Sequence, residues 1–189
     1  MRLLLLGLVV FFATHAVSIV APHWRDRVVL HWGELRWRVC YSLLSLAGLC
    51  LIIAGVAHAR LSPVILYVSS HWMRSLALWL MVPVFPLLLA TWLPGRISAA
   101  MKHPTLVAVK LWALAHLLAN GMEADVWLFG AFLLWAALVR VSLRHRAPRT
   151  ATFAARPLND WLVVLLGLGC YALVLIWLHR LLIGVSPLS

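Results

Sequence analysis

The residues best suited to chemistry lie in an apolar stretch between Met101 and Gly121. Lys110 and His116 interrupt a run that otherwise consists mainly of leucine, alanine and valine. An ionisable side chain in hydrocarbon costs several kcal/mol unless it faces a protein interior, a cavity or a cofactor. We therefore expect this stretch to contribute to the functional site of the chain.

A helix over this stretch sorts its polar residues into rows. Trp112, His116 and Asn120 are spaced by four residues and share one row, whereas His103 and Lys110 share another. His103 and His116 point to nearly opposite faces of such a helix and differ in depth by about 20 Å. These two histidines therefore cannot bind the same metal ion.

His116 needs a partner from another helix if it binds a metal. His15, in the first apolar run, is the leading candidate, and His179 in the last run is the reserve. Neutral imidazole is a good axial ligand of haem iron, and a helical bundle supplies an apolar slot for the porphyrin. Arg25 and Arg27 would then pair with the haem propionates.

Two alternatives stay open at this stage. Buried histidines that hydrogen-bond between helices explain the same pattern without a cofactor. Lys110 either shapes a substrate cavity, or pairs with Asp26, Glu34 or helix-end carbonyls while its ammonium group reaches the membrane surface.

The composition identifies a membrane protein. Hydrophobic residues make up 65% of the 189 residues and charged residues only 11%, which is outside the range of soluble domains. The net charge of +11 comes from basic residues in short loops between apolar runs. This placement is typical of an inner-membrane protein, so we expect a lipid bilayer and no nucleic acid as partner.

The apolar runs predict an all-α, polytopic bundle in which residues 1–189 form a single integral-membrane domain. We expect a kink at Pro83 and Pro86, because proline breaks the hydrogen-bond ladder of a helix. The first run contains a passable signal-peptide cleavage site at His15, but it is long enough to be a retained helix. The six expected transmembrane helices cover residues of about 3–21, 39–57, 72–93, 104–119, 126–143 and 161–183.

Loop charges predict the orientation of the bundle. The loops after the first, third and fifth helices hold eleven Lys and Arg residues, including Arg146 and Arg149, against four on the other side. Basic loops stay in the cytoplasm, so we expect both termini on the periplasmic side of the inner membrane.

These residues together resemble the NnrU family of bacterial membrane proteins. The resemblance rests on His103-Pro104, Lys110, Trp112, His116 and Asn120-Gly121, with His15 on the first helix, the stretch from Tyr41 to Gly48, and the Arg25–Arg27 loop. It covers nearly the whole chain up to about Arg146. NnrU proteins are associated with denitrification and nitric oxide metabolism.

The family is also similar to plant ζ-carotene isomerase, a membrane enzyme that uses haem b to isomerise a cis double bond. The resemblance implies that His15 and His116 serve the haem. The isomerase has a cysteine three residues before the second histidine, where this chain has Ala113. A cysteine-linked change of haem ligation is therefore not available at that position.

Three hypotheses of function follow. The first is an inner-membrane haem b protein that supports nitric oxide metabolism in a redox or gas-linked role, or isomerises a lipophilic polyene. The second is a haem-free assembly or partner protein for a membrane reductase. The third is a small transporter, for which the prolines at 83 and 86 are the main indication.

Overall fold

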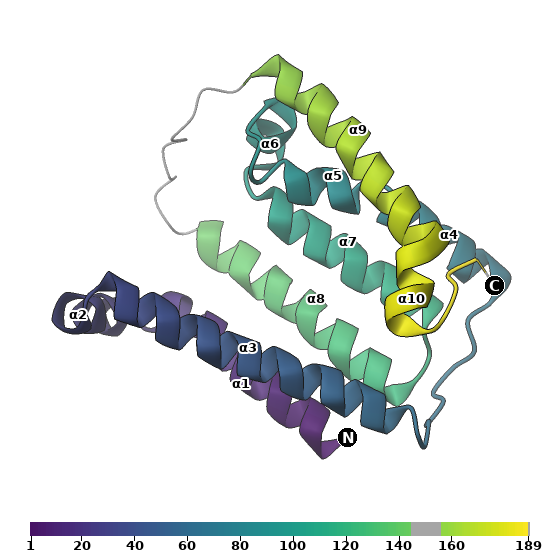
Figure 1. Ribbon diagram of the computed structural model, residues 1–189, viewed down its shortest axis with the longest axis horizontal. Helices are drawn as coiled ribbons and strands as arrows, with labels where there is room; N and C mark the ends of the chain where they lie inside the picture. The colour runs from purple at the N-terminus through teal and green to yellow at the C-terminus, as the bar shows by residue number, and fades with distance from the viewer. Residues whose placement is uncertain (145–155, 189) are drawn as a thin grey trace. The chain divides into compact units, whose positions relative to one another are not determined.

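A computed structural model describes residues 1–144 and 156–188, so Arg146 and Arg149 of the predicted basic loop lie outside the described residues. The described chain is all-α, as predicted, and its strand-like pairing is confined to one isolated bridge between Ile65 and Met122. In chain order (Figure 1) the helices are α1 (Arg2–Val20), α2 (Pro22–Trp32), α3 (Glu34–Ala59), α4 (His71–Met81), α5 (Val84–Leu89), α6 (Arg96–Met101), α7 (Pro104–Ala119), α8 (Glu123–Arg144), α9 (Pro157–Leu173), the π-helix η1 (Val174–Leu178) and α10 (His179–Ile183).

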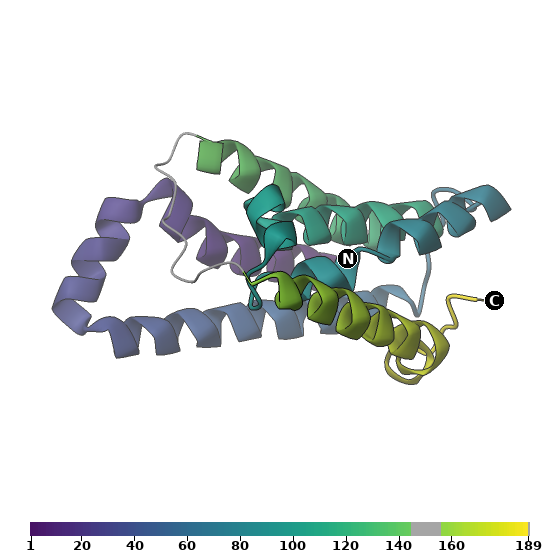
Figure 2. The same cartoon turned by 90° about the horizontal axis from the view of Figure 1, so that it is seen from above.

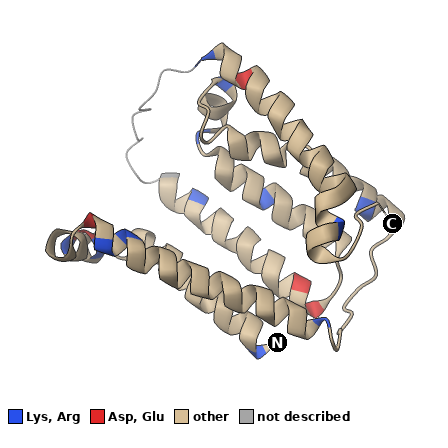
Figure 3. Cartoon of the chain, in the orientation of Figure 1, with Lys and Arg blue, Asp and Glu red and all other residues tan. Residues whose placement is uncertain are grey.

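Most of the predicted membrane helices are long enough to span a bilayer. Among the described residues, five segments are sufficiently long and apolar, namely Arg2–Val20, Glu34–Ala59, His71–Leu89, Glu123–Leu143 and Pro157–Ile183. The remaining predicted helix, α7, is apolar but has 16 residues. Figure 3 shows that the long middle part of α3 carries no charged residues, which suits contact with lipid.

The segment of residues 23–38, predicted as a loop, is helical. Pro22 stands at the start of α2, where its missing N–H needs no partner. Gly33 then ends α2 with a φ of 84°, a value that glycine adopts without strain. The prediction of a loop was wrong because charged residues are as compatible with a helix as with a loop, and this segment forms α2 and the first turn of the next helix.

The kink predicted at the prolines is confirmed as a break between α4 and α5. α4 ends at Met81, and α5 begins at Val84 directly after Pro83. Proline has no N–H for the helical ladder and its ring collides with the preceding turn, which explains the interruption between Met81 and Val84. The last predicted helix is likewise interrupted, by η1 before His179.

Contacts divide the chain into two compact units. Unit 1 comprises Met1–Val68 and Asn120–Ser142, and unit 2 comprises Ser69–Ala119 and Leu143–Ser189. The expectation that residues 1–189 form a single domain stays a prediction.

In unit 1, α1 and α3 pack along their lengths. Leu4, Leu8 and Ile52 are buried between them together with Ala124 from the start of α8. Figure 2 shows α2 as the arm that joins α1 to α3 at one end of this pair. Unit 1 is therefore built on two long helices with a small aliphatic core.

In unit 2, α7 packs against α4 and α5, and α9 covers α5. Val84, Leu87 and Ala108 form its buried core, and Trp112 packs against that core. The core of unit 2 thus lies directly beside the helix face that carries Trp112 and His116.

Candidate functional site

His15 lies in the fourth turn of α1 with a fixed ring orientation. Its Nδ1 atom is 2.8 Å from the carbonyl oxygen of Phe11, one helical turn earlier. Because a carbonyl oxygen only accepts hydrogen bonds, Nδ1 carries the proton. The lone pair therefore resides on Nε2, the atom through which such a histidine binds a metal.

Aromatic rings from three helices surround His15 in unit 1. The Phe11 ring stacks on the imidazole with centroids 4.2 Å apart. Tyr41 of α3 and Trp135 of α8 meet it edge-on, at centroid distances of 5.4 and 5.9 Å. These contacts restrict rotation of the imidazole and limit the access of water.

This aromatic cluster contains a buried donor that no sequence argument singled out. The indole Nε1 of Trp135 is inaccessible to solvent and has no hydrogen-bond partner among the described residues. An unpaired buried donor costs about 1–3 kcal/mol. The cluster therefore offers an N–H group to any acceptor that enters beside His15.

His116 has the same ring geometry in unit 2. Its Nδ1 atom donates to the carbonyl oxygen of Trp112 at 2.8 Å, again one turn earlier. The Trp112 and His116 rings lie 5.2 Å apart at an angle of 50°. The predicted row of Trp112 and His116 is confirmed, and Nε2 is again the lone-pair atom.

His179, the reserve ligand, also lies in unit 2. It follows η1 directly, and its Nδ1 atom donates to the carbonyl oxygen of Val185 at 2.7 Å. It is close enough to His116 for an electrostatic interaction between the two side chains. π-Helical turns occur frequently at functional sites, so His179 competes with His15 as a partner for His116.

The hydrogen bond to the preceding turn does not by itself mark a metal ligand. His31, on the exposed face of α2, makes the same bond to the carbonyl oxygen of Arg27 at 2.8 Å. His15 and His116 differ from it in being partly buried and in contacting aromatic rings. His15 lies in unit 1 and His116 in unit 2, so their pairing stays a prediction.

The two arginines predicted for the propionates lie on α2. Arg25 pairs with Asp26 at 2.9 Å, and both side chains are exposed. Arg27 is exposed as well. Arg25 thus already has a carboxylate partner, and a haem propionate would have to replace Asp26 in order to pair with it.

The other motif residues frame α7. The carbonyl oxygen of His103 accepts hydrogen bonds from Leu106 and Val107 and so starts the helix. Lys110 is half-buried, and its predicted partners Asp26 and Glu34 pair instead with Arg25 and Arg38. The membrane-surface position of the Lys110 ammonium group stays a prediction.

Asn120 and Gly121 follow the last residue of α7, as predicted, and the backbone of both lies close to Tyr67. The Tyr67 hydroxyl donates to the Asn120 carbonyl oxygen at 2.7 Å. A Cβ atom on Gly121 would lie 1.8 Å from the Tyr67 carbonyl oxygen, so only glycine fits. Burial, and secondarily the Asp125 carboxylate, raises the pKa of the Tyr67 phenol, which keeps it a donor.

The described residues contain no group of three or more His, Cys, Asp or Glu side chains able to hold a metal ion. Haem iron needs only axial ligands from the protein, since the porphyrin supplies its other four nitrogen atoms. The site residues are therefore individual imidazoles in aromatic surroundings.

A comparison with protein families identifies the chain. The family model described as NnrU protein matches residues 3–187, so the chain belongs to the NnrU family. No curated protein and no solved structure matches the chain.

Proposed function

We propose that this NnrU-family membrane protein binds haem b, whose iron His15 and His116 would hold, in a redox or gas-linked role in nitric oxide metabolism. The observation that supports this most directly is that both histidines combine this tautomer with partial burial beside aromatic rings, whereas His31 has the same tautomer on an exposed helix. Each histidine donates Nδ1–H to the carbonyl oxygen four residues earlier, at 2.8 Å, and keeps its lone pair on Nε2. A ring held through Nδ1 in this way has the tautomer and orientation that metal-ligating histidines commonly have.

The surroundings of both residues fit a porphyrin. Phe11, Tyr41 and Trp135 around His15, and Trp112 beside His116, are flat apolar surfaces against which a macrocycle can pack. The unpaired Trp135 Nε1 offers a hydrogen bond to an acceptor at the same place. Haem carries such acceptors in its propionates.

When bound, haem would supply one-electron and gas-binding chemistry. The protein's part is to orient and shield. The carbonyl oxygens of Phe11 and Trp112 hold the imidazoles in place, and the aromatic rings exclude water, while Arg27 is available to a propionate. Since Ala113 replaces the cysteine of the related isomerase, the redox or gas-linked role is preferred to polyene isomerisation.

Visible spectra test the proposal. The detergent-purified protein would be compared, oxidised and dithionite-reduced, with its His15→Ala, His116→Ala and His31→Ala variants. We expect a Soret band with sharp reduced α and β bands that both of the first two substitutions abolish. His31→Ala is the matched control, because it loses the same hydrogen-bond geometry on the exposed helix α2.

Further outcomes separate the alternatives. Circular dichroism on each variant shows whether lost pigment reflects lost ligation or lost folding. Added imidazole should restore the bands in a folded ligand variant. Loss of the bands in His179→Ala but not in His15→Ala would replace the proposed ligand pair. A colourless protein from a haem-replete host would contradict the proposal and support the haem-free partner protein.

A further inference from the structure

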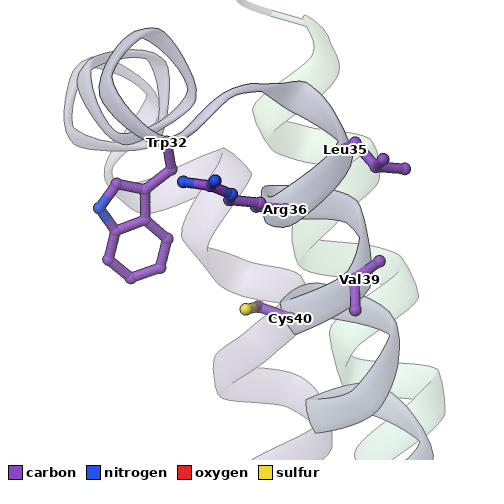
Figure 4. Close-up of a pocket in the computed structure, with 5 residues that line it drawn as sticks. All are labelled: Trp32, Leu35, Arg36, Val39 and Cys40. Carbon is purple, nitrogen blue, oxygen red and sulfur yellow. The ribbon is translucent and has the colours of Figure 1, made fainter.

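An open groove lies where α2 meets α3 in unit 1. It has a volume of about 460 Å³ and is lined by Trp32, Leu35, Arg36, Val39 and Cys40. Figure 4 shows Leu35 and Val39 on one side of α3, and the Arg36 side chain reaching toward Trp32 on the other, with Cys40 one turn beyond. The lining is mostly apolar, and its one charged group is the guanidinium of Arg36.

Arg36 has no carboxylate partner within the described part of the chain. The chain has five acidic residues, all of them described. Two of these pair with Arg25 and Arg38, close to Arg36 in sequence. The other three are engaged elsewhere: Glu123 with Trp127, Asp125 with Arg60, and Asp160 with the backbone of α6.

The groove lies at the level where a helix leaves the membrane. α3 has 26 residues. Such a helix is about 39 Å long and exceeds the hydrocarbon core of about 30 Å, so its ends enter the headgroup region. Arg36 is in the first turn of α3, and Val39 and Cys40 follow in the direction of the hydrocarbon. Tryptophans at 24, 32 and 37 suit this interfacial level.

We propose that this groove binds an anionic phospholipid, whose phosphate pairs with Arg36 while an acyl chain lies along Val39 and Cys40. The charge of the site selects the lipid, since a guanidinium without a carboxylate partner favours a headgroup of net negative charge over a zwitterionic one. The apolar lining matches a hydrocarbon chain rather than a free phosphate ion. This site is independent of haem binding.

Lipid retention tests the proposal. The full chain would be reconstituted in bilayers with equal amounts of phosphatidylglycerol and phosphatidylcholine of identical acyl chains, extracted in detergent, and its co-purified lipids counted by native mass spectrometry. We expect phosphatidylglycerol to be preferred by ~5-fold, the effect of about one interfacial arginine. Arg36→Gln should abolish most of this preference.

Two further variants make the result specific. Arg96→Gln removes one charge from an exposed side chain that does not line the groove, and should leave the preference unchanged. Val39→Trp keeps the charge but fills the groove, and should reduce retention of either lipid. Equal retention of the two lipids by the native protein, or equal losses in Arg36→Gln and Arg96→Gln, would overturn the proposal. A Soret change in Arg36→Gln would assign the groove to the porphyrin instead.

Discussion

The two units solve the problem of packing apolar helices in different ways. In unit 1, α1 and α3 are unbroken over 19 and 26 residues, and glycines let their backbones touch. A Cβ atom on Gly7 or Gly55 would lie 2.6 Å from Ile52 N or 2.4 Å from Leu4 N. Small residues at a helix crossing are a common device in membranes, where burial of apolar surface gives little driving force.

Unit 2 is built from interrupted helices held by polar bonds to the backbone. The Asp160 carboxylate accepts hydrogen bonds from the N–H groups of Arg96 and Ile97, both at 3.0 Å. The Tyr171 hydroxyl donates to the Leu78 carbonyl oxygen at 2.9 Å, near the break after α4. Unpaired backbone groups cost several kcal/mol in lipid, so each interruption requires such a partner. Hydrogen bonds to the backbone therefore stabilise unit 2, whereas close helix packing stabilises unit 1.

Breaking the close packing of unit 1 should have the largest effect. Gly55→Ala places a Cβ atom against the backbone of Leu4, which cannot yield as a flexible side chain would. We expect the free energy of unfolding to fall by about 3 kcal/mol, the upper end of the usual range for overpacking. The midpoint of denaturation in detergent measures it. Gly130→Ala, where the added Cβ meets nothing within 4 Å, is the control and should change little.

Removing a backbone partner in unit 2 should have an intermediate effect. Asp160→Ala deletes both hydrogen bonds at the start of α6, and the loss of a capping carboxylate costs about 1–2 kcal/mol. Asp160→Asn keeps one acceptor oxygen and should lie between the two. Hydrogen exchange at Arg96 and Ile97 would locate the change, and unaltered protection there would contradict this account of unit 2.

Trp135→Phe should have the smallest effect on stability. The substitution removes a buried donor that has no partner among the described residues. We therefore expect the free energy of unfolding of the haem-free protein either to fall by less than ~1 kcal/mol or to rise. If Trp135 donates to a bound cofactor, the same variant should release haem faster. A marked destabilisation without haem would show that the indole N–H has a protein or water partner.

The sequence predicted the fold class, five of the six membrane helices and the break at the prolines, because these depend on local hydropathy and on proline chemistry. It also predicted the row of Trp112 and His116, which follows from helical spacing alone. α2 was missed because its charged residues lie on a helix near the membrane surface, where polarity no longer distinguishes helix from loop.

Tertiary features could not be predicted in this way. The contacts of Trp135 with His15 and of Tyr67 with Asn120 join residues more than fifty positions apart, and no local pattern specifies them. Arg25 pairs with the adjacent Asp26, and Arg38 pairs with Glu34 one helical turn away. That Arg36 has no carboxylate partner in the described part of the chain is apparent only when all five acidic residues have been located. These positions are distinguished by their tertiary contacts rather than by their residue types.

The π-helix before His179 also changes how the end of the chain should be drawn on a helical wheel. A π turn holds one more residue than an α turn, which shifts the angular register by about 100°. Side chains from His179 onward therefore face a direction that extrapolation from α9 would assign to a neighbouring residue. Deleting one residue within Val174–Leu178 would restore the α-helical period. The His179 side chain would then lie on another face of the helix, although the order of the remaining residues would be unchanged.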